Sequence, residues 1–65
     1  MKIKVNGNII DFDKSTIKDI IIQYKLENRK VVVEKNGIII NRDDYSNEII
    51  YDGDNIEIIR MVGGG

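Results

Sequence analysis

The chain has 65 residues, ten basic and eleven acidic side chains, a net charge of −1, and neither cysteine nor histidine. Disulfides, Cys/His zinc sites and thiol nucleophiles are therefore excluded, and the near-neutral charge suits nucleic acid poorly, since its binding depends on neutralising phosphates. So short a chain forms one domain. Its fifteen isoleucines and five valines favour strands, because β-branched side chains suit a pleated sheet.

Membrane spans and targeting signals are not expected. The longest apolar runs are triplets such as residues 38–40, whereas a bilayer span needs roughly 20 residues. Residues 1–5 alternate in character instead of forming the apolar block of a signal peptide. We therefore expect no membrane and no nucleic acid among the partners, and a cytoplasmic location.

The strand signals come in two pairs, each joined by Asn-Gly. Residues 2–5 alternate charged and apolar side chains, and Asn6-Gly7 separates them from a second apolar segment at residues 8–12. Asn-Gly between apolar runs predicts a hairpin, because a type I′ turn needs positive φ at both central residues. Residues 31–34 and 38–40, joined through Asn36-Gly37, are predicted to form a second hairpin.

Between the hairpins the apolar period changes to that of a helix. Apolar side chains at i, i+3, i+4 and i+7 mark one helical stripe: Ile17, Ile20, Ile21 and Tyr24. Thr16, followed by Asp19, resembles a capping box. We expect a helix from Ile17 to about Lys25 with this stripe in the core and Ile22 at its edge.

The remaining segments complete the order of elements. Residues 42–48 are polar and predict a turn of helix with Tyr45 folded onto the core. Asp52-Gly53 predicts a turn before a final strand at residues 56–61. This order is that of an α+β, ubiquitin-like β-grasp fold, with a mixed sheet of four to five strands and one main helix on one face. We expect the final strand in mid-sheet, parallel to the first.

The acidic residues provide no evident catalytic pair. They form three loose clusters: Asp11 with Asp13, Asp43 with Asp44, and Asp52 with Asp54. All lie at expected turns, whereas an acid–base pair needs burial to raise one pKa, so we interpret them as solvated turn residues. A calcium loop at Gly53 and a phosphate loop at Lys14 lack the required residues. We expect no catalytic side chain, no metal, no bound cofactor, and an ordinary surface role for Arg42.

The glycine triplet is the strongest candidate site. We divide the chain into a domain, 1–62, and a flexible tail, 63–65, in which Gly63, Gly64 and Gly65 follow the last strand. Three glycines do not stabilise a fold, but without Cβ atoms they can thread a partner's narrow channel. The carboxylate of Gly65 is ionised at neutral pH. Activation, for example as a mixed anhydride with AMP, would let sulfur displace AMP and leave a thiocarboxylate. The alternative is a disordered end or a cloning remnant.

Several short motifs at matching spacing resemble the ThiS family, the sulfur carriers of thiamine (thiazole) biosynthesis. The helix start matches in Thr16, Ile17, Ile20 and Ile21; further matches are residues 36–45, 53–58 and 62–65. One departure is Asn41, where proline is common; it affects only a loop.

The resemblance implies that this protein is a co-substrate and not an enzyme. A ThiF-like, E1-like adenylyltransferase would use ATP to adenylate Gly65, with Gly63 and Gly64 in its channel. Sulfur from a cysteine desulfurase or another donor would give the thiocarboxylate, and a ThiG-like thiazole synthase would take that sulfur. Two alternatives stay open: a molybdopterin synthase small-subunit-like carrier, which is usually longer, and a ubiquitin-like tag or interaction module.

Overall fold

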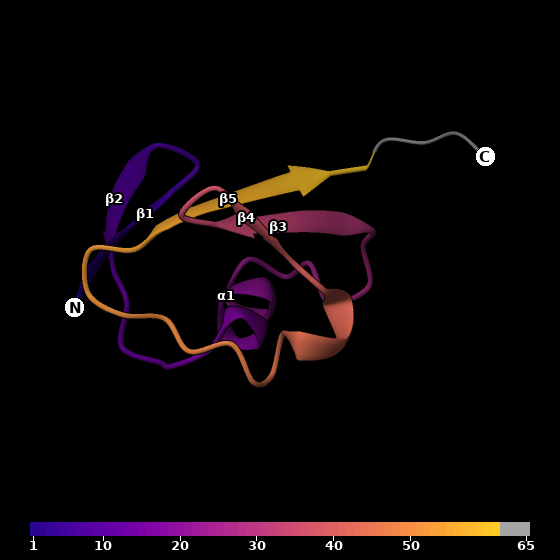
Figure 1. Ribbon diagram of the computed structural model, residues 1–65, viewed down its shortest axis with the longest axis horizontal. Helices are drawn as coiled ribbons and strands as arrows, with labels where there is room; N and C mark the ends of the chain where they lie inside the picture. Colours follow the sequence, from indigo (N-terminus) through magenta and orange to yellow (C-terminus); the bar gives the residue numbers. More distant parts are fainter. Residues whose placement is uncertain (62–65) are drawn as a thin grey trace.

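In the part of the chain that the structure describes, one mixed sheet has one α-helix packed on one face (Figure 1). The computed structural model describes residues 1–61. The elements in chain order are β1 (Lys2–Val5), β2 (Asn8–Asp11), α1 (Ile17–Gln23), β3 (Val31–Lys35), β4 (Ile38–Ile40), the 3₁₀ helix η1 (Arg42–Asp44) and β5 (Asn55–Arg60). The five strands have the order β2-β1-β5-β3-β4. The predicted α+β, β-grasp arrangement is confirmed.

The last strand lies in the middle of the sheet, as predicted. β5 runs parallel to β1, with Val5 opposite Ile56, and antiparallel to β3, with Val33 opposite Ile58. The other neighbouring strands are the two predicted antiparallel hairpins. At both hairpin turns the Asn and the Gly have positive φ, 50° and 85° at Asn6-Gly7 and 53° and 84° at Asn36-Gly37. The turn chemistry therefore sets the pairing.

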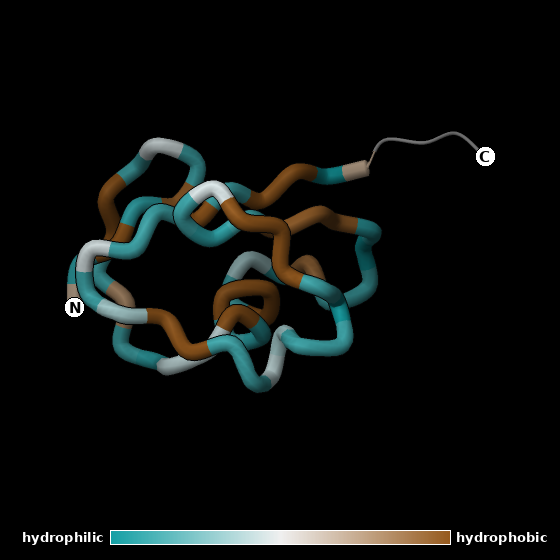
Figure 2. Tube along the Cα trace, viewed as in Figure 1, coloured by the Kyte–Doolittle hydropathy of each residue, from teal (hydrophilic) through white to brown (hydrophobic). Residues whose placement is uncertain are grey.

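The core lies between the sheet and α1, and apolar stretches of the helix and the strands make it up (Figure 2). The helical stripe contributes three fully or almost fully buried side chains. All the buried residues are hydrophobic: Ile3, Val5, Phe12, Ile17, Ile20, Ile21, Val33, Ile50, Ile56 and Ile58. Tyr45 packs against this cluster, as predicted.

The N-terminus of α1 is closed by a complete capping box. Thr16 Oγ1 accepts a hydrogen bond from Asp19 N (3.3 Å), and Asp19 Oδ2 accepts from the backbone N–H of Thr16 (2.9 Å) and of Ser15 (3.1 Å). The next two helical N–H groups are satisfied by the loop that follows η1, since Ile17 N donates to Glu48 O and Lys18 N to Tyr45 O. Side chain and loop together satisfy the donors that a helix start leaves unpaired.

The end of α1 differs from the prediction. The helix ends at Gln23, and Tyr24 is its C-cap with 38 % of its surface exposed, so Tyr24 is not a core residue. Lys25 takes a left-handed conformation, φ 58°. Two backbone hydrogen bonds then close the end of the helix: Lys25 N donates to Ile22 O, and Leu26 N donates to Ile21 O. This is the Schellman motif. It turns the chain so that Leu26, and not Tyr24, packs against the core.

Lys35 connects the long loop between β4 and β5 to the sheet. Its Nζ forms salt bridges with Glu48 (2.7 Å) and Asp54 (3.9 Å) and donates to Ile49 O (2.9 Å). The side chain is 15 % exposed, so this polar cluster is largely shielded from water. It fixes the loop over the edge of the core that Ile50 fills.

Candidate functional site

The glycine tail itself is outside the described residues. The predicted sites Gly63, Gly64 and Gly65, and the predicted boundary after residue 62, all follow Met61, the last residue that the structure describes. The structure does describe the place from which the tail starts. The candidate site is therefore the end of β5 and the surfaces around it.

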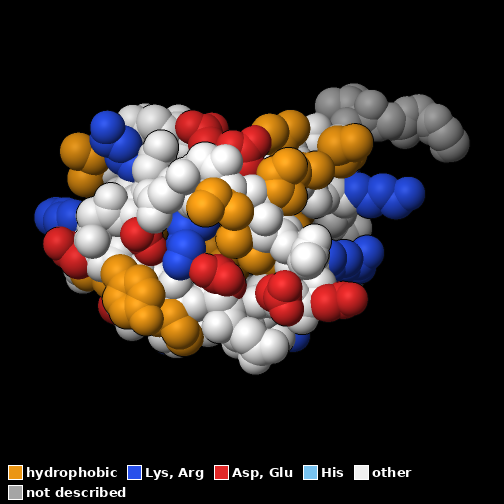
Figure 3. Space-filling model, in the orientation of Figure 1, with side chains coloured by type: hydrophobic (Ala, Val, Ile, Leu, Met, Phe, Trp, Pro, Cys, Tyr) orange, Lys and Arg blue, Asp and Glu red, His pale blue; other side chains and the backbone are white. Residues whose placement is uncertain are grey.

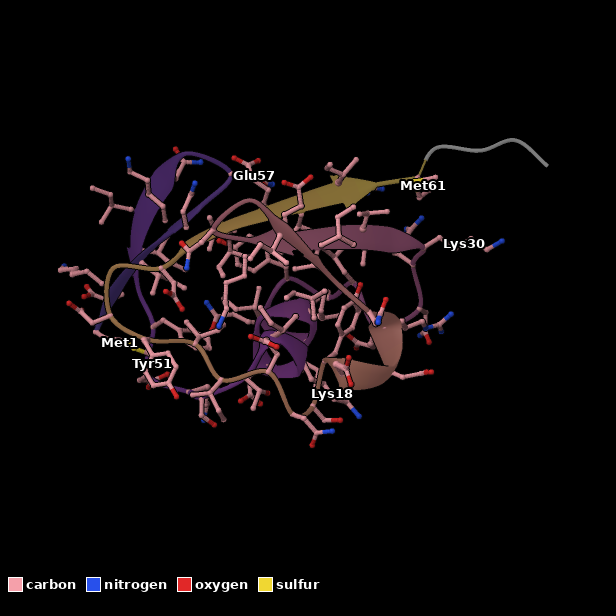
Figure 4. All side chains as sticks on the ribbon, in the orientation of Figure 1. Met1, Lys18, Lys30, Tyr51, Glu57 and Met61 are labelled. Atoms are coloured by element: carbon pink, nitrogen blue, oxygen red, sulfur yellow. The ribbon has the colours of Figure 1, made fainter. Side chains whose placement is uncertain are left out.

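The end of β5 is held firmly by backbone pairing. Arg60, the last residue of β5, pairs with Val31 of β3. One residue further along, Met61 N donates to Lys30 O at 2.9 Å. Figure 4 shows Met61 and Lys30 at the same end of the molecule. The central strand β5 is thus paired with β3 as far as its last residue, and this pairing sets the starting point of the tail.

A side chain from the first turn extends this pairing in a way that the sequence did not reveal. Asn6 Oδ1 accepts from Ile58 N (2.7 Å), and Asn6 Nδ2 donates to Ile58 O (3.3 Å). The asparagine amide thus continues the β1–β5 ladder where β1 has ended. The Asn-Gly pattern predicted a turn at this position, but a contact across 52 residues of sequence has no local signal.

An exposed apolar group lies on the outer face of the sheet, at the end of β5. Side chains alternate across a strand, so the pairs Val32–Ile59 and Glu34–Ile39 point away from α1, as does Met61. Ile39, Ile59 and Met61 are each about half to two-thirds exposed. Figure 3 shows hydrophobic side chains collected near this end of the sheet. We call Val32, Ile39, Ile59 and Met61 the outer patch.

Two glutamates border the outer patch. Glu34 and Glu57 are directly opposite one another on β3 and β5, and Figure 4 shows Glu57 on the side of the sheet away from α1. Like charges facing each other across a strand pair are destabilising. The arrangement does not serve the fold, and it gives the outer face an apolar centre beside negative charge.

The three carboxylate clusters have different structural roles. Asp11 forms a salt bridge with Lys2 at 2.8 Å, and hydrogen bonding to Lys2 and its positive charge lower the pKa of Asp11. Asp13, Asp43 and Asp44 are exposed turn residues, as predicted. Asp52 accepts from Lys2 N at 2.8 Å. None of these contacts brings two carboxyl groups together for acid–base chemistry.

The prediction that Asp54 is a solvated turn residue was wrong. Its carboxylate accepts from Tyr51 N (2.8 Å) and from Asn36 Nδ2 (3.0 Å), and its side chain is 12 % exposed. Asp54 therefore joins the turn before β5 to the second Asn-Gly turn. Within residues 1–61, no group of three or more carboxylates could hold a metal ion. In the same residues, no helix is long and apolar enough to cross a bilayer.

A family model, a relative of similar length and a solved structure indicate the same family. The model of the ThiS family matches residues 3–65. The sulfur carrier protein ThiS of Bacillus subtilis (strain 168) is 40% identical over 65 residues, which cover 97% of this chain and 98% of that protein. The crystal structure of a thiamine biosynthesis protein (ThiS) from Geobacter metallireducens has a TM-score of 0.80 and 29% identity, with 100% of both chains covered.

A different kind of relative is much longer than this chain. A thiazole synthase of Paramagnetospirillum magneticum (strain ATCC 700264 / AMB-1) is 35% identical over 66 residues. The match covers 100% of this chain and 20% of that protein. A segment similar to this whole chain is therefore part of a thiazole synthase polypeptide.

Proposed function

This chain belongs to the ThiS family, and we propose that it is a sulfur carrier of thiamine biosynthesis that works through the carboxylate of Gly65. The observation that carries the proposal is the family match, which extends through the glycine triplet to residue 65. The geometry at the end of β5 supports it, because that strand presents whatever follows Met61 from a fixed point of the sheet.

The proposed chemistry takes place in two steps on the carboxylate. An E1-like, ThiF-like adenylyltransferase uses ATP: a Gly65 carboxylate oxygen bonds to the α-phosphorus and pyrophosphate leaves, giving an acyl adenylate. In the second step a persulfide sulfur, supplied by a donor such as a cysteine desulfurase, attacks the carbonyl carbon and AMP leaves, giving an acyl disulfide. A thiol then attacks the donor's own sulfur, so that the S–S bond breaks, the thiol and the donor form a disulfide, and the acyl-bound sulfur keeps the electron pair. The product is a thiocarboxylate, whose sulfur a ThiG-like thiazole synthase takes for thiazole formation.

In this proposal the chain is a co-substrate and its partners supply the catalysis. The sequence has no cysteine or histidine, and no described carboxylate is placed beside a second one for proton transfer. What the chain supplies is a rigid domain and a tail without Cβ atoms at Gly63, Gly64 and Gly65. Because the activation needs ATP and the product resembles a thiolate, we expect the reaction in the reducing cytoplasm.

The outer patch supports contact with the protein that takes the tail. Exposed apolar groups next to a functional segment are typical of protein–protein contacts. Ile59 is near the end of β5 and Met61 is the last described residue before the tail, so a protein that holds Gly65 is brought close to them. The similarity of this chain to a segment of a thiazole synthase supports such an enzyme as one of these partners.

Variants of the tail test the proposal. Deleting Gly65, or changing Gly64→Phe, should abolish sulfur transfer to thiazole in a system reconstituted with adenylyltransferase, sulfur donor and thiazole synthase. Ile22→Ala, on the exposed side of α1, is the control and should leave the rate unchanged. A truncated protein that supports thiazole formation at the normal rate would contradict the proposal.

The form in which the protein is recovered, and the product that receives its sulfur, distinguish the alternative functions. A ubiquitin-like tag would be recovered joined through its C-terminus to lysines of other proteins, whereas a carrier is recovered free with terminal sulfur. A molybdopterin synthase small-subunit-like carrier would give its sulfur to molybdopterin synthesis and not to thiazole.

A further inference from the structure

A cleft of about 510 Å³ opens between α1, the segment that follows it, and η1. Its floor is apolar and consists of Ile21, Leu26, Val31 and Tyr45. Its rim is basic and consists of Lys18, Arg29, Lys30 and Arg42. We call this feature the basic cleft. It is separate from the outer patch, because Ile21 and Val31 are on the core side of the sheet and Ile59 is on the opposite side.

The charge of the cleft contrasts with that of the whole chain. The net charge of the protein is −1, yet the lining contains four cationic side chains and a single carboxylate, Glu27. Within residues 1–61, the salt bridges involve only Lys2 and Lys35 among the basic residues. The four rim cations therefore have no carboxylate of residues 1–61 within salt-bridge distance, and their attraction is available to a partner.

The floor is built by the unusual end of α1. The left-handed Lys25 turns the chain so that Leu26 returns over Ile21, which creates an apolar surface between two basic segments. Tyr45 closes the other side, and burial raises the pKa of its hydroxyl while the positive charge of Arg42 partly opposes this shift. An apolar floor inside a cationic rim is complementary to a peptide segment with an apolar side chain between carboxylates.

The cleft is next to the place where the tail begins. The backbone carbonyl of Lys30, a rim residue, accepts the hydrogen bond from Met61 N at 2.9 Å, and Figure 4 shows Lys18 beyond η1, farther from Met61 than Lys30 is. An extended chain advances about 3.3–3.6 Å per residue, so Gly65 reaches at most about 14 Å beyond Met61. A protein that encloses Gly65 therefore lies within a short distance of the cleft.

We propose that the basic cleft binds an acidic segment of the thiazole synthase that takes sulfur from Gly65, with carboxylates at Lys18, Arg29 and Arg42 and an apolar side chain on the floor. The inference rests on the proposed function. We name a thiazole synthase as the occupant because one such enzyme contains, in its own polypeptide, a segment similar to this whole chain. Complementary charge at this position speeds encounter and fixes the orientation in which the tail enters the active site.

Charge-reversal variants test the inference by direct binding to thiazole synthase from the same organism. The test variant is Lys18→Glu with Arg42→Glu, which changes two rim positions. The matched control is Lys4→Glu with Lys14→Glu, which changes the net charge equally at exposed positions outside the lining. A third variant, Lys18→Arg with Arg42→Lys, keeps the charges. Circular dichroism and urea unfolding establish that each variant is folded.

The test variant should bind thiazole synthase about tenfold or more weakly at low salt, and the difference should shrink near 1 M salt, where the Debye length falls to about 3 Å. The control and the charge-preserving variant should bind within about twofold of the original protein. If the test variant does not fold, Arg29→Glu compared with Lys14→Glu makes the same comparison with single changes.

Equal binding by the test and control variants would overturn the inference. So would a loss confined to the adenylyltransferase step with unchanged binding to thiazole synthase, because the occupant would then be a different protein. These failures are distinct from failure of the proposed function, in which the unaltered protein would acquire no thiocarboxylate at Gly65.

Discussion

Replacing Ile20 by Ala should remove a large part of the stability of this domain. Ile20 has no exposed surface and is the middle residue of the stripe that α1 packs against the sheet. The truncation deletes three carbon atoms, worth about 0.8 kcal/mol each by transfer alone, and leaves a cavity, so the total cost should be about 2–5 kcal/mol. At about 0.05–0.15 kcal/mol per residue, a domain of this length has roughly 3–10 kcal/mol in all.

Urea unfolding followed by circular dichroism at 25 °C measures this cost. With a slope of about 1 kcal/mol per molar urea, as expected for so small a domain, the midpoint should fall by about 2–5 M. Ile22→Ala is the matched control, because Ile22 is on the same helix with 48 % of its surface exposed, and it should cost less than about 1 kcal/mol. Equal losses for the two variants, or a loss below 1 kcal/mol for Ile20→Ala, would refute the proposed packing of α1.

Three further predictions concern features that hold the domain together. Lys25→Gly should stabilise the protein by about 0.5–1 kcal/mol, because glycine adopts positive φ without strain; a gain no larger than that of Lys25→Ala would contradict this. Lys35→Met should lower the free energy of unfolding by about 1–3 kcal/mol, because charged hydrogen bonds are lost. Lys2→Met, at an exposed salt bridge, should leave it unchanged within error. Equal losses for the two variants would argue against a stabilising role for the polar cluster around Lys35. Hydrogen bonds from Thr16 N and Ser15 N lower the pKa of Asp19 below its ordinary 3.8. The contribution of Asp19 to the free energy of unfolding is therefore complete above that pH and is lost as the pH falls through the lower native pKa. Asp19→Asn should make the free energy of unfolding less dependent on pH in this acid range, and an unchanged pH dependence would exclude the effect.

Local patterns in the sequence were sufficient for most of the fold. The two Asn-Gly turns, the stripe of Ile17, Ile20 and Ile21, and the central last strand were predicted because each depends on local turn chemistry, local periodicity or element order. The end of α1 was predicted wrongly, since Tyr24 continues the helical spacing and a lysine at position 25 carries no signal for a left-handed turn. Tertiary packing of Leu26 determines the outcome there.

The candidate site, like the fold, could be predicted from the sequence only in part. The glycine triplet and the family motifs are evident in the sequence, whereas the surfaces that accompany them are not. The basic cleft combines cations from three separate segments, represented by Lys18, Arg29 and Arg42, and Arg42 was expected to be an ordinary surface cation. The role of Asp54 and the contact of Asn6 with Ile58 likewise depend on residues that only the folded chain brings together.

The central claim is that the carboxylate of Gly65 accepts sulfur, and the absence of cysteine makes it directly measurable. Purified without its partners, the protein should resist thiol-specific alkylation, because it has no thiol and the thioethers of its methionines react far more slowly. After incubation with ATP, the adenylyltransferase and a sulfur source, one alkylatable group should appear, since a thiocarboxylate presents an anionic sulfur much as a thiolate does. Mass spectrometry should place the label on Gly65, and omission of ATP should prevent it. A protein that stays unlabelled in a complete and demonstrably active system, or a label on any other residue, would contradict the account.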